Sequence, residues 1–234
     1  MTPTSGAVRK STGREYFESI IIAVILALFV RTWVVQAFKI PTGSMEQNLL
    51  IGDHLLVNKF VFAPSVTGFE RSVLPIGSVE RGDILVFKYP EEPERDFIKR
   101  VIGLPGETLE VRDKRVFIDG EPLDEPYLQQ MGSRGGGGLV LDRRDNFGPV
   151  SIPAGRYFMM GDNRDNSNDS RGWGTVRLEE LKGPAFILYW SWDVNANMLS
   201  FFNPVNWWRA EKRWDRIFQR VKCQSVEDAA SPTR

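Results

Sequence analysis

The sequence predicts a mostly β domain that follows one N-terminal transmembrane helix. Residues 19–38 contain a single charged residue, Arg31, which is typical of a membrane span. After this stretch, short runs of β-branched and aromatic residues alternate with Gly and Pro, a pattern that favours strands joined by turns. With 42% hydrophobic residues in 234, the chain is too apolar to be disordered and long enough for one core-bearing domain and a smaller element.

The composition excludes several classes of function. Lys and Arg total 30 and Asp and Glu total 30, so the net charge is zero and gives no reason to expect nucleic acid as a partner. The one cysteine, Cys223, allows no intrachain disulfide and no Cys-rich zinc site. We therefore expect no metal and no cofactor. Because His54 is the only histidine, an enzyme built on this sequence is expected to use another base.

The first predicted element is a transmembrane helix over residues 16–37. At about 1.5 Å per residue, the apolar stretch spans roughly the 30 Å of a bilayer's hydrocarbon core. Tyr16 and Trp33 bracket it as interfacial aromatic residues. Its densest part, residues 20–30, is short enough for a cleavable signal peptide, but no small-x-small cleavage site follows. We interpret the segment as an uncleaved anchor.

The charges on either side of the anchor predict its orientation. Arg9, Lys10 and Arg14 precede it, whereas Lys39 is the only basic residue in the twenty positions that follow residue 38. The positive-inside rule then assigns residues 1–15 to the cytoplasm as a tail. No later stretch is long and apolar enough to cross again, so the protein is expected to be single-pass. Residues 38–222 form the predicted extracytoplasmic β-rich domain, and residues 223–234 form a flexible C-terminal tail.

Seven runs in this domain are predicted to be strands, and two turns punctuate them. A hairpin turn is expected at residues 112–115 and a second turn at Asp119-Gly120. The glycines of residues 132–138 indicate a flexible loop, because no helix start follows them as a phosphate-binding loop requires. The predicted strands cover residues 55–57, 84–87, 97–102, 108–111, 116–118, 157–160 and 186–190.

One further helix is predicted near the C-terminus, over residues 207–221. Apolar residues fall on one helical face and basic residues on the other. Such a helix can dock on the sheet or lie on anionic lipid, and the pattern leaves both possibilities open. The apolar face would hold Trp207, Ala210, Trp214, Ile217, Phe218 and Val221, and the basic face Arg209, Lys212, Arg213, Arg216 and Arg220.

A bend is expected directly after the anchor. Pro41 and Gly43 flank the hydroxyl residues Thr42 and Ser44. Proline restricts φ and glycine permits unusual backbone angles, so the bend could expose Ser44 and leave its backbone N–H free. An ordinary linker has the same composition, and on these residues alone that alternative stays open.

Lys99 lies within the predicted strand 97–102. Because side chains alternate between the two faces of a strand, Lys99 shares a face with Phe97 and Val101. Apolar neighbours disfavour the ammonium, and lowering its pKa from about 10.4 to roughly 7–8 costs about 4 kcal/mol. Lys99 would then be a candidate general base near neutral pH, whereas Arg100 on the opposite face stays charged. The alternative is an edge-strand lysine that extends into water.

Residues 160–174 are unusually rich in Asp, Asn, Ser and Arg. A calcium loop that starts at Asp165 would require Gly where Ser170 stands and Glu where Val176 stands, so calcium is not expected. Interleaved Asp and Arg fit a buried hydrogen-bonded network better, in which Ser167 or Ser170 could orient an amine. With Ser44 and Lys99, this loop makes a Ser–Lys nucleophile plausible. His54 has no evident reason to face the serine.

Four ordered blocks of residues resemble the bacterial type I signal peptidases. They are Pro41-Thr42-Gly43-Ser44-Met45 with residues 52–59, Arg81-Gly82-Asp83-Ile84, residues 98–106, and residues 161–167 continuing to Asp169-Ser170-Arg171. The resemblance extends from the anchor to about Phe218. It implies a domain of coiled antiparallel β-sheets, like that of signal peptidases and repressor-type proteases, and the activity of a serine endopeptidase with a Ser–Lys dyad.

The resemblance also implies roles for individual residues. Pro-Thr usually follows the nucleophile block in this family, and here Gln47-Asn48 stands instead, which puts the turn geometry beyond Ser44 in doubt. The implied roles are Ser44 as nucleophile, Lys99 as general base, Thr42 and the Ser44 N–H as oxyanion hole, Ser167 as hydrogen-bond partner of the lysine amine, Asp169 and Arg171 as the pair that supports the loop, and Met159 and Met160 as apolar lining.

The implied substrates are preproteins whose signal peptides carry small residues at the first and third positions before the cut. The implied location is the bacterial cytoplasmic membrane, with the N-terminus in the cytoplasm, the catalytic domain outside, and the lipid bilayer and the protein-export machinery as partners. Two alternatives remain at this stage. One is a non-catalytic, membrane-tethered binding domain of the same fold, and the other is a self-cleaving repressor-type protease, against which the anchor argues.

Overall fold

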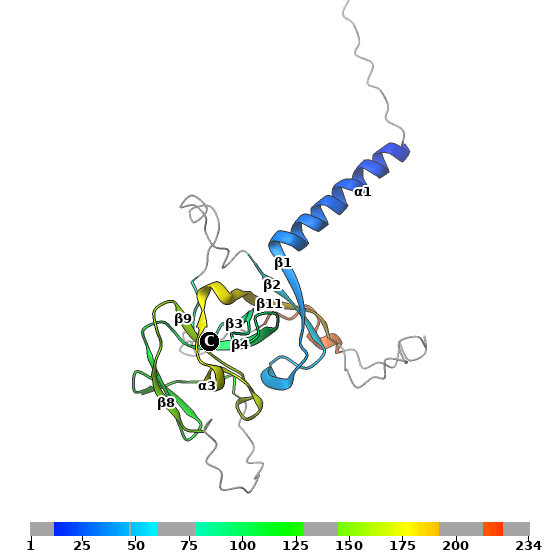
Figure 1. Cartoon of the computed structure of the whole chain (residues 1–234). Coiled ribbons are helices and arrows are strands. Elements are labelled where there is room, and N and C mark those ends of the chain that lie inside the picture. The colour runs from blue at the N-terminus through cyan, green and yellow to red at the C-terminus, as the bar shows by residue number, and fades with distance from the viewer. Residues whose placement is uncertain (1–11, 47, 60–77, 129–144, 192–212, 222–234) are drawn as a thin grey trace, which may run out of the picture.

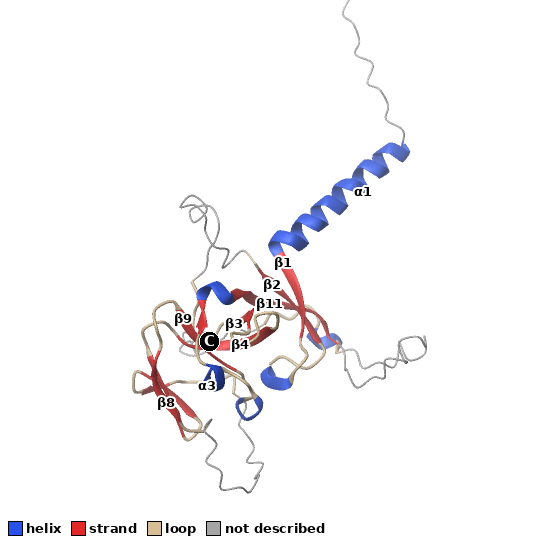
Figure 2. Cartoon of the chain, in the orientation of Figure 1, coloured by secondary structure: helices blue, strands red, loops and turns tan. Residues whose placement is uncertain are grey.

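The computed structural model describes residues 12–46, 48–59, 78–128, 145–191 and 213–221. It confirms a mostly β domain preceded by one long helix (Figures 1 and 2). The helical segments are α1 (Thr12–Phe29), η1 (Val30–Val34), η2 (Gly43–Met45), η3 (Arg164–Asn166), α3 (Ser170–Trp173), η4 (Leu178–Glu180) and η6 (Trp214–Arg216). The strands are β1 (Val35–Lys39), β2 (Asp53–Asn58), β3 (Ile84–Lys88), β4 (Asp96–Gly103), β5 (Thr108–Arg112), β6 (Arg115–Ile118), β7 (Glu121–Pro122), β8 (Phe147–Ser151), β9 (Arg156–Met160), β10 (Val176–Arg177) and β11 (Leu181–Ser191).

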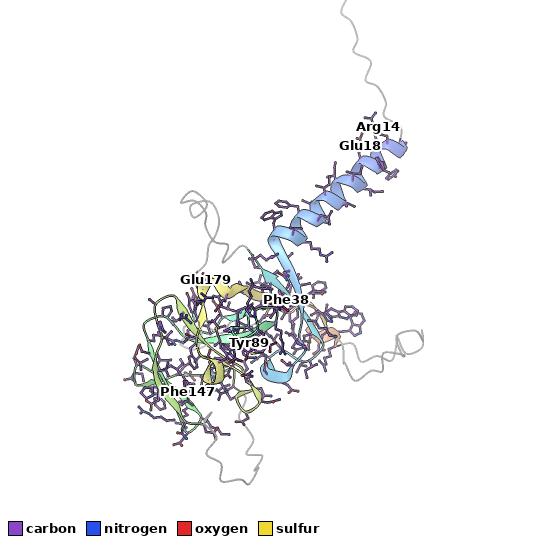
Figure 3. All side chains as sticks on the ribbon, in the orientation of Figure 1. Arg14, Glu18, Phe38, Tyr89, Phe147 and Glu179 are labelled. Atoms are coloured by element: carbon purple, nitrogen blue, oxygen red, sulfur yellow. The ribbon has the colours of Figure 1, made fainter. Side chains whose placement is uncertain are left out.

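The apolar N-terminal helix stands apart from the β-rich part of the molecule (Figure 1). Thr12–Val34 is long and apolar enough to cross a membrane, and none of its most apolar window is buried inside the protein. Its side chains project into open space, and an ion pair of Arg14 with Glu18 lies at the end remote from the β domain (Figure 3). Exposure of the long apolar stretch of this helix is what a membrane span requires.

The boundaries of this helix differ from the predicted range 16–37. The helix begins at Thr12, and helical conformation ends at Val34. Residues 35–37, which were expected to lie in the span, instead begin β1, where Val35 pairs with Asn58 and Ala37 with Leu56. Because apolar β1 residues continue the hydrophobic run of the helix, composition alone does not separate the two elements. The β domain therefore begins three residues earlier than predicted.

The described strands form two antiparallel sheets. The strand order is β1-β2-β11-β3-β4-β9-β10 in the larger sheet and β7-β6-β5-β8 in the smaller one. β11 pairs with β3 at its start and with β2 further along, and register shifts accompany both pairings. Such irregularities bend and twist a sheet, which agrees with the predicted coiled sheets. All seven predicted strands are present, whereas β1, β7, β8 and β10 were not predicted as strands.

Both predicted turns are present. Asp113 and Lys114 connect β5 to β6 with φ of 47° and 68°, as a two-residue hairpin with left-handed central residues requires. Asp119 and Gly120, with φ of 51° and 89°, connect β6 to β7. The predicted loop at 132–138 and the tail at 223–234 lie outside the described residues.

The predicted C-terminal helix is wrong over the part that the structure describes. Only η6 is helical there; a turn at Ile217-Phe218 follows, and Arg220 then forms a bridge with Ile187 of β11. Phe218 N donates to Leu188 O at 2.7 Å, and Leu188 N donates to Gln219 O at 2.9 Å. The open edge of β11 thus satisfies backbone groups that a helix would have paired internally. Residues 207–212, including Trp207 and Ala210, lie outside the described residues.

Candidate active site

Ser44 is the second residue of η2, the short helix that follows the predicted bend. Its neighbour Met45 is fully buried, and Ile40 and Leu49 are almost fully buried in the same core cluster, so the turn is part of the core and not a linker. The first N–H groups of a helix have no partner within it, which leaves the Ser44 N–H available to a ligand. Thr42 Oγ1 lies 3.5 Å from Ser44 Oγ.

Lys99 reaches Ser44 from β4. Lys99 Nζ lies 2.5 Å from Ser44 Oγ, and only 3% of Lys99 is exposed. Burial lowers the pKa of Lys99 to about 8, although the negative charges of Asp169 and Asp162 act in the opposite direction. The Phe97 ring centroid lies 5.4 Å from Nζ and contributes to the apolar surroundings. The prediction of a desolvated lysine is confirmed, and the alternative of a lysine extended into water is excluded.

The loop that follows β9 holds the turn around Ser44 by its backbone. Asn163 N donates to Ser44 O at 3.0 Å, and Asn163 Nδ2 donates to Gly43 O at 3.1 Å. A Cβ atom at Gly161 would lie 2.5 Å from Ser44 O and 2.2 Å from Ser167 Oγ. Only glycine allows the loop to approach the serine this closely.

Asp169 and Arg171 form the predicted charged pair. Arg171 Nε and Nη2 donate to the two carboxylate oxygens of Asp169 at 2.9 Å each, and Arg171 Nη2 also donates to Arg164 O at 2.7 Å. Asp169 Oδ2 accepts from Gly161 N at 3.2 Å, so the pair supports the loop beside Ser44. Burial acts to raise the pKa of Asp169, but hydrogen bonds and charge from Arg171 hold it below its usual value.

Ser167 lies beside this loop but lacks the predicted contact. The residue is buried, and no hydrogen bond within the described part of the chain joins its Oγ to Lys99 Nζ. The expected hydrogen bond to the Lys99 amine is therefore not formed in this structure. The physical reason is that Lys99 Nζ is directed at Ser44 Oγ, while Ser167 Oγ lies against Gly161.

An ion pair between Arg100 and Asp162 was not predicted. Arg100 Nε and Nη2 donate to the two Asp162 oxygens at 2.8 and 2.7 Å, and Arg100 Nη1 donates to Gly82 O at 2.8 Å. Both side chains are at most 2% exposed. The sequence did contain a signal for this ion pair. Arg100 follows Lys99 in a strand with apolar residues on both faces, so at least one of the two charged side chains had to be buried together with a partner.

Asn48 connects this ion pair to the turn around the serine. Its Nδ2 donates to Asp162 Oδ2 at 2.6 Å and to Tyr127 O at 3.3 Å. Its backbone N donates to Met45 O at 3.2 Å. Asn48 therefore anchors the turn beyond Ser44, whose geometry the Gln47-Asn48 pair put in doubt, to the loop after β9 that contains Asp162 and Asn163. Gln47 lies outside the described residues.

His54 does not belong to this group. It lies in β2, where its Nδ1 is 3.1 Å from Gly52 O and its ring packs against Tyr189. Burial lowers its pKa. Met159 and Met160 are buried in the strand that precedes the loop, as expected for an apolar lining. Within the described ranges, no cluster of three His, Cys, Asp or Glu side chains could hold a metal.

The arrangement can support nucleophilic attack on a carbonyl group. A neutral lysine amine at hydrogen-bond distance can accept the proton of a serine hydroxyl, the part that histidine plays in the Ser–His–Asp triad. The Ser44 N–H and the Thr42 hydroxyl, whose Oγ1 lies 3.5 Å from Ser44 Oγ, are hydrogen-bond donors on the same turn. Donors in such positions stabilise the oxyanion of a tetrahedral intermediate.

Comparisons with known proteins identify the family to which the chain belongs. The family model described as "Signal peptidase, peptidase S26" matches residues 13–190. The chain is 38% identical over 220 residues to signal peptidase I of Pseudomonas aeruginosa, and the alignment covers 82% of this chain and 78% of the relative. It is 35% identical over 186 residues to a probable signal peptidase I-2 of Synechocystis, with coverage of 77% and 75%. A crystal structure of a signal peptidase I from Enterococcus faecalis is 33% identical and covers 46% of this chain and 97% of its own, with a TM-score of 0.40.

These matches define the class of the protein as a peptidase, a hydrolase of peptide bonds. The chain belongs to the signal peptidase family, peptidase S26. Membership of this family supports the cleavage of signal peptides, and the N-terminal apolar helix supports attachment to a membrane.

Proposed function

We propose that this chain is a membrane-anchored serine endopeptidase that removes signal peptides from exported preproteins with a Ser44–Lys99 dyad. The observation that carries the proposal is the 2.5 Å separation of Lys99 Nζ and Ser44 Oγ in a site where both residues are buried. No other described lysine combines burial, a lowered pKa and contact with a serine hydroxyl. Ser44 is the nucleophile and Lys99 is the general base.

The reaction proceeds in two halves. The neutral Lys99 amine takes the proton of Ser44 as Oγ attacks the scissile carbonyl, and the ammonium then gives that proton to the leaving amine. The Ser44 N–H and Thr42 hydroxyl stabilise the oxyanion. Lys99 then activates a water that hydrolyses the ester and releases Ser44. Asn163, Asp169 and Arg171 act through the loop that holds the serine turn.

The site is proposed to work at the outer face of the bacterial cytoplasmic membrane, with the N-terminus in the cytoplasm. Support comes from the excess of basic residues before the apolar stretch and from the short connection between Val34, where helical conformation ends, and Ser44. This distance keeps the nucleophile near the boundary where the end of a membrane-inserted signal peptide emerges. The resemblance supports small residues at the first and third positions before the cut, and the export machinery as a partner.

The proposal is tested by incubating the full-length chain in detergent micelles with a purified preprotein. The wild type and a Ser151→Ala variant, which removes an exposed serine of β8, should both release the shortened product. Ser44→Ala should release none. Cleavage by Ser44→Ala at the wild-type rate would contradict the dyad. Intact preprotein with the wild type would favour the non-catalytic binding domain, and shortening of the enzyme itself would favour the repressor-type protease.

A further inference from the structure

A cavity of about 500 Å³ lies where the N-terminal helix meets the sheet, at the opposite end of β1 from the bend that carries Ser44. Its walls come from the end of the helical segment, from β1 and from β2. Most of the lining is apolar, and the polar groups are two cations and one amide. The lining residues are Val30, Arg31, Val35, Gln36, Ala37, Leu56 and Lys59.

The two cations of this cavity, Arg31 and Lys59, have no acidic neighbour in its lining. Neither forms a salt bridge within the part of the chain that the structure describes. The Lys59 ammonium carries three N–H donors, of which one bonds to Thr32 O at 3.0 Å. Lys59 N also donates to Val34 O at 3.0 Å, so the end of β2 is fixed to the end of the helix. Two positive charges therefore face one space whose lining, among the described residues, contains no carboxylate.

The cavity lies at the level of the lipid headgroups if the helix spans the bilayer. Trp33, which is 63% exposed, lies next to Arg31 and Val34 at the same end of the helix, where interfacial tryptophans are found. Figure 1 shows that α1 continues almost directly into β1, so this junction marks the emergence of the chain from the membrane. Apolar walls with cations at this depth match the acyl–glycerol region and the phosphate of a phospholipid.

We infer that this cavity is a binding site for one anionic phospholipid of the outer leaflet, with its phosphodiester between Arg31 and Lys59. Charge complementarity favours an anionic headgroup such as that of phosphatidylglycerol. A zwitterionic headgroup would bring an ammonium to a site whose described lining holds no carboxylate. The apolar side chains of Val30, Val35 and Leu56 contact the first methylenes of the acyl chains. The inference rests on the membrane-spanning helix of the proposed function but not on the peptidase activity.

The test measures which lipid stays bound to the full-length protein. The protein is exposed in micelles to equal amounts of phosphatidylglycerol and phosphatidylcholine with identical acyl chains, and bound lipid is counted by native mass spectrometry. Each cation near an anionic headgroup changes occupancy by roughly fivefold, so the double variant Arg31→Gln, Lys59→Gln should lower the preference for phosphatidylglycerol by roughly 25-fold. The double variant Lys39→Gln, Lys88→Gln removes two charges at exposed positions outside the cavity and should keep the preference.

Three results would overturn the inference. The first is an unchanged preference for phosphatidylglycerol in the Arg31→Gln, Lys59→Gln variant, and the second is an equal loss of that preference in the Lys39→Gln, Lys88→Gln variant. The third is retention of sn-glycerol 3-phosphate in place of the lipid, which would make the cavity a site for soluble phosphate esters. A variant with Arg31→Lys and Lys59→Arg keeps both charges and should retain the lipid even where the glutamine variant folds poorly. Preprotein cleavage measured on the same samples reports the proposed function separately.

Discussion

The pH dependence of cleavage should report the buried lysine. The pKa of Lys99 is lowered from 10.5 to about 8, and at about 1.4 kcal/mol per unit this corresponds to about 3 kcal/mol of disfavoured charge. At pH 7 roughly one tenth of Lys99 is then neutral, against roughly one in three thousand for a lysine of ordinary pKa. The lowered pKa thus increases the population of the competent base by roughly 300-fold.

The assay is kcat/KM for a short peptide with a signal-peptide cleavage site, measured from pH 5 to pH 11. Because only the neutral amine can act as base, kcat/KM should rise about tenfold per pH unit below pH 8 and level off above it. A His54→Gln variant should give the same curve, since His54 lies in β2 against Tyr189. An onset near pH 10.5 would refute the argument from desolvation, and a shifted curve in the His54 variant would implicate histidine as the base.

Three further predictions concern the contacts that hold the serine turn. Asn48→Ala removes a hydrogen bond to a buried carboxylate worth about 1.5–3 kcal/mol and should lower kcat at least tenfold with little change in KM. The control Asn146→Ala removes a hydrogen bond to the exposed turn at Asp113 and should have no effect on kcat. A loss confined to KM in the Asn48 variant would contradict the positioning role. Arg100→Met leaves Asp162 buried without its partner and should lower the free energy of unfolding by about 3–5 kcal/mol in urea titrations, and an unchanged midpoint would contradict it. Gly161→Ala should reduce kcat at least 100-fold in a protein that still folds, because the new Cβ would displace the Ser44 carbonyl. A wild-type kcat would show that the close approach of Gly161 to Ser44 is unnecessary.

The sequence predicted best what depends on neighbouring residues. The hairpin at Asp113-Lys114 and the strand that carries Lys99 follow from local turn chemistry and from alternation. β1 was missed because its apolar residues extend the hydrophobic run of the membrane helix. The helix predicted at 207–221 failed where described because the open edge of β11 offers hydrogen bonds that no local pattern reveals.

In the candidate site, too, residues with a local sequence signature were predicted and contacts set by the tertiary fold were not. Ser44 and Lys99 were identified, since each has a local signature, and the structure brings them together across 55 positions of sequence. The partner of Arg100 was not identified, because Asp162 is 62 positions away and only the tertiary fold makes them neighbours. The missing bond of Ser167 is of the same kind, since the direction of the Lys99 amine is set by packing and not by the identity of either residue.

The central claim is that the Lys99 amine is the base that activates Ser44. The most direct test is preprotein cleavage by Lys99→Met, which keeps the length and apolar character of the side chain but carries no amine. The melting temperature at pH 7 should be at least that of the wild type, because the variant buries no ammonium. The account predicts that the folded variant produces no shortened product above the rate of Ser44→Ala. Cleavage within tenfold of the wild-type rate would contradict it.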